Sequence, residues 1–279
     1  MLKLMYITNR PEVAKIADSS GVDRIFVDME YIGKDARQGG MDTVQSHHTE
    51  KDVQAVKSVV KNSQIIVRCN PIHDKTEKYS SSKEEINGII NAGADIVMLP
   101  YFKTLKEVQT FIKLVDKRAK TMLLVETPEA VSIIDEILNV DGVDEIHIGL
   151  NDLSLGYNKK FMFELLTDGT VEKLCNKFKS KKIPYGFGGI AALGKGTLPS
   201  EKVIAEHYRL GSTCAILSRS FCNTSLITNL DEIQNVFCVE LKAIRNWEEK
   251  CQSGNVDFIK NRKDVENSIN EIIKGFNLV

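Results

Sequence analysis

Two acidic residues follow apolar runs at a spacing that could build a metal site. Glu126 comes directly after Leu123–Val125, and Asp152 lies shortly after Ile146–Ile148. If these runs are consecutive parallel strands joined by a helix, both carboxylates reach the same end of one sheet. Two converging carboxylates suit a hard divalent cation and leave open positions for water and a substrate oxygen. The alternative is that each acid only caps the helix that follows its strand.

The elements that must position these acids recur along the chain. Short apolar or β-branched runs are spaced at intervals of roughly 20 to 30 residues, the period of strand-helix units. We expect strands at residues 3–8, 24–29, 64–69, 96–99, 121–125, 145–149, 184–187 and 213–217. About eight such units close a (β/α)₈ barrel. Capping-box spacings that begin at Ser81 and Thr104 predict two of the helix starts.

The tail carries more helix than one barrel needs. We expect helices at Asp231–Cys251 and Lys263–Phe276, so that residues 1–279 form a single TIM-barrel domain with 228–279 as a C-terminal helical extension. One helix covers the eighth strand. The apolar face of the other must lie against its own barrel or against a neighbouring subunit, and we expect a homo-oligomer, with packing on its own barrel as the alternative.

The bulk composition excludes several classes of partner. The 279 residues include 37 basic and 38 acidic side chains, well interspersed, so a basic surface for nucleic acid is not expected. Charged residues interrupt every apolar stretch before the roughly 18 residues that a membrane span needs. The six cysteines form no C-x-x-C pair, and the start shows no signal-peptide pattern, so we expect reduced thiols and a cytoplasmic protein.

Residues that follow the strands can be assembled into one site, because a barrel of this type carries its chemistry on the loops after the strand ends. Several carboxylates, one arginine and glycine-rich backbone would suit an anionic substrate held by a metal. The members of this ring are Asp28, Glu30, Tyr31, Arg68, Asn70, Pro100, Glu126, Asp152, Gly188, Gly189 and Ser218–Ser220.

Five segments, in order and spacing, resemble a known family of barrel enzymes. The family includes the citrate lyase beta subunit and metal-dependent pyruvate aldolases such as 4-hydroxy-2-oxo-heptanedioate aldolase. The matching segments are Phe26–Glu30, Ile66–Pro71, Ala92–Pro100, Val125–Val131 and Ile148–Ser154. The resemblance implies a TIM (β/α)₈ barrel of the phosphoenolpyruvate/pyruvate-binding type that assembles into trimers or hexamers.

The resemblance also implies a reaction, a divalent-metal-dependent carbon–carbon lyase or aldolase acting on a small 2-oxo acid such as pyruvate or oxaloacetate. Glu126 and Asp152 would bind Mg²⁺ or Mn²⁺, and Arg68 would contact the oxo and carboxylate oxygens, because an enolate needs a Lewis acid and a fixed cation. The alternative for Arg68 is a salt bridge to Asp28 or Glu30. The expected catalytic residues are Arg68, Asp28, Glu30 and His48, and the expected substrate-binding residues are Arg68, Gly149, Asn151, Asp152, Pro100 and Gly188.

Two departures from the aldolase pattern keep other substrates open. Tyr31 stands where pyruvate aldolases of this family carry a histidine, and Leu124 stands where they favour glutamine. Both differences, together with Arg68-x-Asn70-Pro71 and Lys34-x-Ala36-Arg37, favour the citrate lyase side. A lyase of citryl- or malyl-coenzyme A thioesters is therefore one alternative. A barrel that binds a ligand without catalysis is another.

Four further features have competing interpretations. His47 and His48 could replace the missing histidine as acid-base groups, or could be solvated residues ahead of a helix. His147 is expected to be a core histidine and Cys69 a small core residue. Gly186–Ala191 imitates a dinucleotide-binding fingerprint, but its late place in the chain favours a close-packed loop after strand seven.

Overall fold

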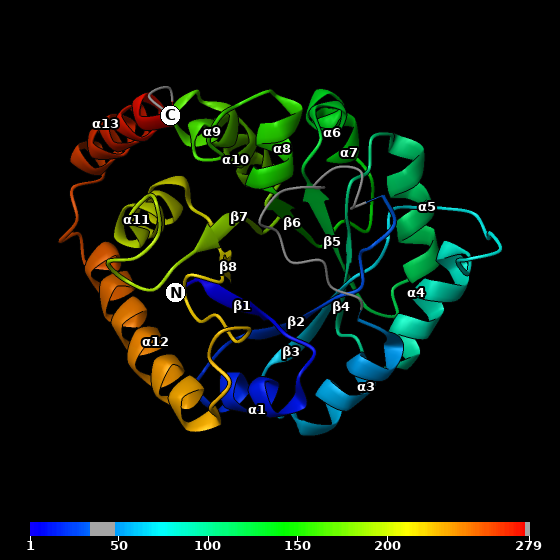
Figure 1. The fold of residues 1–279 in the computed structure, drawn as a ribbon. Helices are drawn as coiled ribbons and strands as arrows, with labels where there is room; N and C mark the ends of the chain where they lie inside the picture. The colour runs from blue at the N-terminus through cyan, green and yellow to red at the C-terminus, as the bar shows by residue number, and fades with distance from the viewer. Residues whose placement is uncertain (34–47, 277–279) are drawn as a thin grey trace.

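The eight expected strands form one closed parallel barrel. A computed structural model describes residues 1–33 and 48–276, and each strand hydrogen-bonds to its neighbours in chain order, with β8 closing against β1 (Figure 1). The strands are β1 Lys3–Ile7, β2 Arg24–Asp28, β3 Gln64–Arg68, β4 Ile96–Leu99, β5 Lys120–Val125, β6 Glu145–Ile148, β7 Tyr185–Ile190 and β8 Cys214–Leu217. The predicted TIM (β/α)₈ barrel is thus confirmed.

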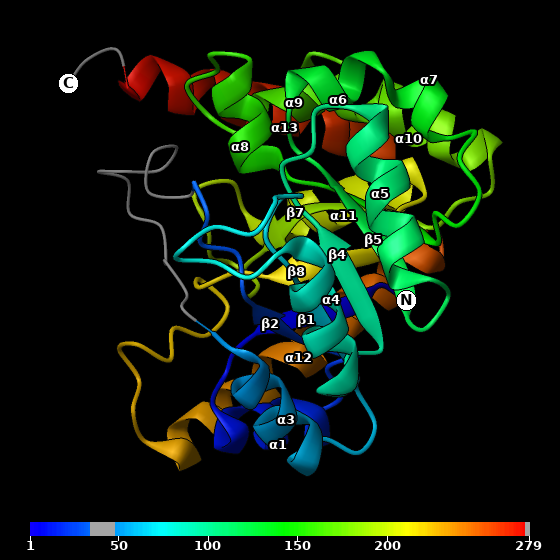
Figure 2. The same ribbon diagram turned by 90° about the vertical axis from the view of Figure 1, so that its right-hand side faces the viewer.

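Helices surround the barrel on its outside (Figures 1 and 2). They are α1 Pro11–Ser19, α3 Glu50–Val59, α4 Ser82–Asn91, α5 Leu105–Val115, α6 Pro128–Ser132, α7 Ile134–Ile137, α8 Leu150–Gly156, α9 Glu164–Thr167, α10 Thr170–Ser180, α11 Ser200–Leu210, α12 Leu230–Gln252 and α13 Phe258–Phe276. The predicted capping boxes are present, since Ser81 accepts from the Glu84 amide and Thr104 from the Glu107 amide. Within the described ranges, no helix has the length and apolar character required to cross a membrane.

Strand alternation divides the core into two layers. Residues such as Val27 and Leu123 point outward and pack under the helices, whereas Phe26 and Leu124 point into the barrel. The inner cluster consists of Met5, Phe26, Ile66, Ile96, Met98, Met122, Leu124 and Cys214. The barrel interior is therefore filled with side chains up to the level at which the strand-end residues begin.

The two C-terminal helices form as expected, but the second begins five residues earlier than predicted. α13 begins at Phe258 instead of Lys263, because the Asp257 carboxylate accepts hydrogen bonds from the amides of Ile259 and Lys260 (both 3.0 Å). α13 packs against α11 and α9 of the same chain, and Val265 and Ile269 are buried there. Part of the apolar face of the extra helix is thus covered by its own barrel, whereas Ile259 and Phe276 stay largely exposed.

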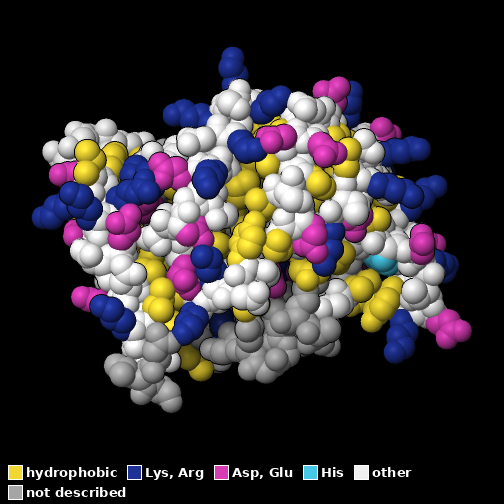
Figure 3. Space-filling view, turned by 90° about the horizontal axis from the view of Figure 1, so that it is seen from above, with side chains coloured by type: hydrophobic (Ala, Val, Ile, Leu, Met, Phe, Trp, Pro, Cys, Tyr) yellow, Lys and Arg dark blue, Asp and Glu magenta, His cyan; other side chains and the backbone are white. Residues whose placement is uncertain are grey.

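Charged side chains of both signs are interspersed over the face seen in Figure 3. The deepest ion pair lies inside the barrel, where Arg24 makes two hydrogen bonds to Glu145 (2.6 and 2.8 Å). Both side chains are almost completely buried. Because each charge is compensated by the other, replacing either one alone would leave a buried charge without its partner.

Candidate functional site

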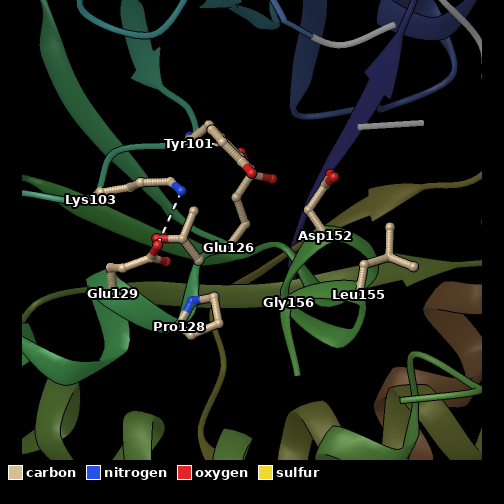
Figure 4. Close-up of a pocket in the computed structure, with 9 residues that line it drawn as sticks. Tyr101, Lys103, Glu126, Pro128, Glu129, Asp152, Leu155 and Gly156 are labelled. Carbon is tan, nitrogen blue, oxygen red and sulfur yellow. Dashed lines mark hydrogen bonds and ion pairs between the residues drawn. The ribbon is translucent and has the colours of Figure 1, made fainter. Parts of the chain in front are cut away.

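The two acids singled out by their spacing lie side by side at one end of the barrel. Glu126 follows β5, and Asp152 lies in the first turn of α8, directly after β6. Figure 4 shows both side chains beside one hollow. Glu126 is almost completely buried, and its Oε1 accepts a hydrogen bond from the backbone N–H of Tyr101 (2.9 Å). The carboxylate is therefore held by a loop that follows a different strand.

Gly149 explains how the two acids can lie so close together. A Cβ atom at this position would stand 2.7 Å from Glu126 Oε2 and 2.8 Å from Glu126 Cβ. Both distances are well below van der Waals contact, so only glycine leaves the space that Glu126 occupies. The predicted substrate-binding residue Gly149 thus has a packing role that concerns the carboxylate itself.

The electrostatics of the acid pair favour a cation. Burial, with the nearby Glu30 and Asp152 carboxylates, raises the pKa of Glu126 well above its usual value, and Arg68 opposes this effect. Negative charges that are this close and this desolvated repel one another unless a positive charge lies among them. A divalent ion bound to both oxygens would remove that repulsion.

The donor set fits a hard divalent cation. Glu126 and Asp152 supply oxygen ligands, which such ions prefer. Across residues 1–33 and 48–276, no three His, Cys, Asp or Glu side chains are grouped so as to surround one ion. An ion at this place would therefore take two ligands from these side chains and keep positions for water and a substrate.

Arg68, at the end of β3, lies in a network of ion pairs. Its Nε and Nη2 donate to the two carboxylate oxygens of Asp28 (2.8 and 2.7 Å), and its Nη1 lies 3.2 Å from Glu30 Oε2. The guanidinium also packs over the Phe26 ring, 5.8 Å from its centroid. The alternative considered from the sequence, a salt bridge to these two acids, is therefore present. The same contacts fix the direction of the guanidinium.

A hollow of about 560 Å³ lies over the barrel end and brings most of the predicted residues together. Asp28, His48, Arg68, Glu126, Gly149, Asn151, Asp152 and Gly188 line it. Glu30 is buried beneath it in contact with Arg68. Pro100 is buried and lines neither this hollow nor the smaller one described below, so the structure does not place it with the others.

His48 reaches the hollow, whereas Tyr31 does not. The Nδ1 of His48 accepts a hydrogen bond from the backbone N–H of Asp28 (3.1 Å), so a neutral ring carries its proton on Nε2. The Tyr31 ring packs against Tyr79 and lies near Glu85 and Asn70, outside the residues that line the hollow. His47 lies outside the described residues, as do Lys34, Ala36 and Arg37.

Three other predictions concern the interior. His147 is completely buried, its Nε2 lies 3.1 Å from the carbonyl oxygen of Gly188, and burial lowers its pKa to about 4. It is a neutral core histidine at the base of the hollow, as expected. Cys69 is buried on the outer face of β3, also as expected. The glycine-rich segment differs from the expected loop, because residues 185–190 form β7 itself, with an irregular register between Gly186 and Gly189.

A second hollow of about 310 Å³ lies on the other side of the acid pair (Figure 4). Tyr101, Lys103 and Glu129 line it together with Glu126 and Asp152. Lys103 Nζ lies 3.0 Å from Glu129 Oε1 and 5.2 Å from the centroid of the Tyr101 ring. Sequence reasoning missed these residues, although Tyr101 and Lys103 follow β4 and Glu129 follows β5. Tyr101 has a positive φ of 48°, which nothing in its residue type predicts.

Sequence reasoning missed Arg10 and included Arg219 only within Ser218–Ser220, without giving it a role. Arg10 follows β1 and Arg219 follows β8, and both line the large hollow. Because β1 and β8 are neighbours and β5 lies halfway round the closed ring, these arginines stand across the barrel end from Glu126. Arg10 pairs with Glu12 (2.8 Å) and keeps about a third of its side chain exposed. The sequence signal that could have identified both arginines is their position just after the ends of β1 and β8.

Comparisons with known proteins agree with the barrel fold. The family model described as HpcH/HpaI aldolase/citrate lyase matches residues 3–171, more than half of the chain. An HpcH/HpaI aldolase from Desulfitobacterium hafniense DCB-2 has a similar structure, with 17% identity, a TM-score of 0.60, and coverage of 78% of this chain and 86% of that chain. A search of curated proteins found no match.

Two further solved structures share the fold. An HpcH/HpaI aldolase/citrate lyase family protein from Burkholderia cenocepacia J2315 is 13% identical, with a TM-score of 0.61 over 84% of this chain and 94% of that chain. A variant of the citrate synthase SbnG is 16% identical, with a TM-score of 0.54 over 77% of this chain and 84% of that chain. At such low identity these likenesses show the barrel and leave the chemistry to the site itself.

Proposed function

This chain belongs to the HpcH/HpaI aldolase/citrate lyase family, and we propose that it is a divalent-metal-dependent carbon–carbon lyase or aldolase acting on a small 2-oxo acid. The observation that carries the proposal is the buried Glu126 beside Asp152, in a hollow that Arg68 also lines. A cluster of acids with one fixed arginine suits a substrate that binds through a metal and carries negative charge.

Glu126 and Asp152 would hold the ion, Mg²⁺ or Mn²⁺. When bound, such an ion acts as a Lewis acid that stabilises negative charge developing on the 2-oxo group. The chain contributes the geometry. The Tyr101 amide holds one oxygen of Glu126, and Gly149 leaves space for the other. These contacts keep Glu126 in one orientation before the substrate arrives, which reduces reorganisation during the reaction.

Arg68 would bind the carboxylate end of the 2-oxo acid. Asp28 accepts hydrogen bonds from Nε and Nη2, and Nη1 forms an ion pair with Glu30, which leaves further N–H groups of Nη1 and Nη2 for a ligand in the hollow. The two acids also offset the charge of the arginine while the site is empty of substrate. Arg68 thus serves as a fixed cation whose position does not depend on the substrate.

His48 would donate a hydrogen bond to a substrate oxygen. Because its Nδ1 accepts from the Asp28 amide, a neutral ring carries on Nε2 the proton that such a contact needs. A neutral imidazole can polarise a carbonyl oxygen in this way, as it does in triosephosphate isomerase. His147, with its Nε2 already bonded to a backbone carbonyl, is not assigned this role.

The size of the large hollow and the charges at its two ends bear on the substrate. A hollow of about 560 Å³ has room for more than a three-carbon acid. Glu126 follows β5, and Arg10 follows β1 on the opposite side of the ring, with Arg219 after the neighbouring β8. We therefore propose that the second fragment of the substrate reaches the arginines with an anionic group. A coenzyme A thioester is the second candidate, since its phosphates could make the same contacts.

The test combines a substrate panel with metal binding. Wild-type protein with Mg²⁺ or Mn²⁺ is assayed on 2-oxo acids, aldehydes and acyl-coenzyme A compounds, and Mn²⁺ affinity is measured by calorimetry. Glu126→Gln and Asp152→Asn are each expected to lose metal binding and turnover while the fold survives. Glu129→Gln is the matched control, because this acid lines the smaller hollow but pairs with Lys103.

Wild-type metal affinity in either site variant would refute the assignment of Glu126 and Asp152 as metal ligands. No turnover on any compound of the panel would favour a ligand-binding barrel without catalysis. Turnover of thioesters alone would favour the citryl- or malyl-type lyase.

A further inference from the structure

Asn70 ties the end of β3 to the turn after β2. It lies two residues beyond Arg68, is almost completely buried, and its Oδ1 accepts hydrogen bonds from the backbone N–H groups of Tyr31 and Ile32 (both 2.9 Å). These two amides come directly after Glu30, the acid that contacts Arg68. One side chain therefore fixes the backbone next to an acid of the candidate site.

Glu85 in turn fixes Asn70. This residue of α4 is buried, and its Oε1 accepts hydrogen bonds from both the backbone N–H and the Nδ2 of Asn70 (3.0 and 2.8 Å). The second carboxylate oxygen is buried without a hydrogen-bond partner. A buried carboxylate with one orphaned oxygen is costly, so its presence behind the site calls for an explanation.

We propose that Asn70, oriented by Glu85, is a positioning residue that sets the Glu30–Arg68 contact and thereby the orientation of the guanidinium toward the substrate. The amide of Asn70 has the polarity this needs, since its oxygen accepts from two N–H groups while its nitrogen donates to Glu85. Neither residue lines the hollow, so each acts through its neighbours. The role in catalysis rests on the proposed function. The hydrogen bonds that join Tyr31 and Ile32 to Asn70, and Asn70 to Glu85, form a clamp that does not depend on it.

The chain offers a matched control for loss of such a clamp. Asp18, at the end of α1, is also buried, and its carboxylate accepts hydrogen bonds from the amides of Lys61, Asn62 and Ser63 (3.0, 2.9 and 2.7 Å). These amides precede β3, at the opposite end of the strand from Arg68. Asp18→Ala removes a comparable backbone clamp far from the site.

The experiment compares Asn70→Ala, Asp18→Ala and a polarity exchange between Asn70 and Glu85. Asn70→Ala is expected to lower kcat at least tenfold with a smaller change in KM, because a shift of about 1 Å in a catalytic group can cost about a hundredfold. Asp18→Ala should keep kcat within about twofold, since it changes no residue near the hollow. Equal losses of kcat in the two variants would overturn the proposal.

The exchange tests the hydrogen-bond polarity directly. Asn70→Asp alone places two carboxylates in contact and should lose activity at least tenfold. Combining it with Glu85→Gln removes the repulsion, because a Gln Nε2 in the place of Glu85 Oε1 can donate to the new carboxylate, although it no longer accepts the backbone N–H of residue 70. The double variant should therefore recover part of the lost kcat. A double variant no better than Asn70→Asp would contradict the assignment.

Two readouts need no turnover. Hydrogen exchange at the Tyr31 and Ile32 amides should speed up in Asn70→Ala and slow again in the exchanged pair. Modification of Arg68 by phenylglyoxal, followed by peptide mass, should be several-fold faster in Asn70→Ala than in wild type. If no substrate is turned over but both readouts respond, the proposed function fails and the clamp stands. If neither responds, the clamp fails whatever the reaction.

Discussion

Replacing Gly149 by alanine should displace the Glu126 carboxylate while the fold survives. The new Cβ would lie 2.7 Å from Glu126 Oε2 and 2.8 Å from Glu126 Cβ. Ordinary carbon contacts lie at about 3.5 to 4.0 Å, so one of the two elements must move by roughly 1 Å. The Glu126 carboxylate can rotate, but its Cβ is fixed by β5. Overpacking of this size costs about 1 to 3 kcal/mol of folding free energy.

The same displacement should also weaken metal binding. We expect Mn²⁺ affinity to fall at least tenfold, which corresponds to about 1.4 kcal/mol, because the displaced carboxylate no longer matches the ion. The assay is calorimetry with Mn²⁺, alongside chemical denaturation of the metal-free protein. Gly275→Ala is the control, since its Cβ would meet nothing within 4 Å. Unchanged Mn²⁺ affinity in Gly149→Ala would refute the reasoning.

Three further predictions concern stability, specificity and assembly. Burial lowers the pKa of His207 to about 3 from 6.5, so the folded state resists its protonation and stability falls as pH drops below 6.5. Between pH 6.5 and 5, the free energy of unfolding should therefore fall by about 2 kcal/mol less in His207→Phe than in wild type, as measured by denaturation. An equal fall in both proteins would contradict this. Arg10→Gln and Arg219→Gln should each lower kcat/KM about tenfold for an acceptor with a second anionic group, relative to a neutral acceptor of the same length. Equal effects on both acceptors would remove the arginines from substrate recognition. Finally, the full-length chain is expected to be a homo-oligomer that dissociates on truncation after Gly254, as measured by light scattering, and a full-length monomer would refute this.

Local sequence patterns were enough to predict the barrel and the place of its acids. Strand alternation and helix caps depend on residues within about ten positions of one another, so local patterns predicted all eight strands and the capping boxes at Ser81 and Thr104. Once parallel strands are placed, their carboxyl ends share one face. Glu126 and Asp152 therefore had to lie near each other, and His147 had to point into the interior.

The contacts that hold those residues join segments that lie far apart in the chain. The Tyr101 amide on Glu126, the two acids on Arg68 and the clamp of Asn70 by Glu85 join segments from different strands and helices. The identities of these partners depend on distances of a few ångströms across the barrel end, which one-dimensional spacing does not encode. For the same reason the sequence predicted Gly149 only as a substrate-binding residue. Its packing against Glu126 follows from the pairing of β5 with β6.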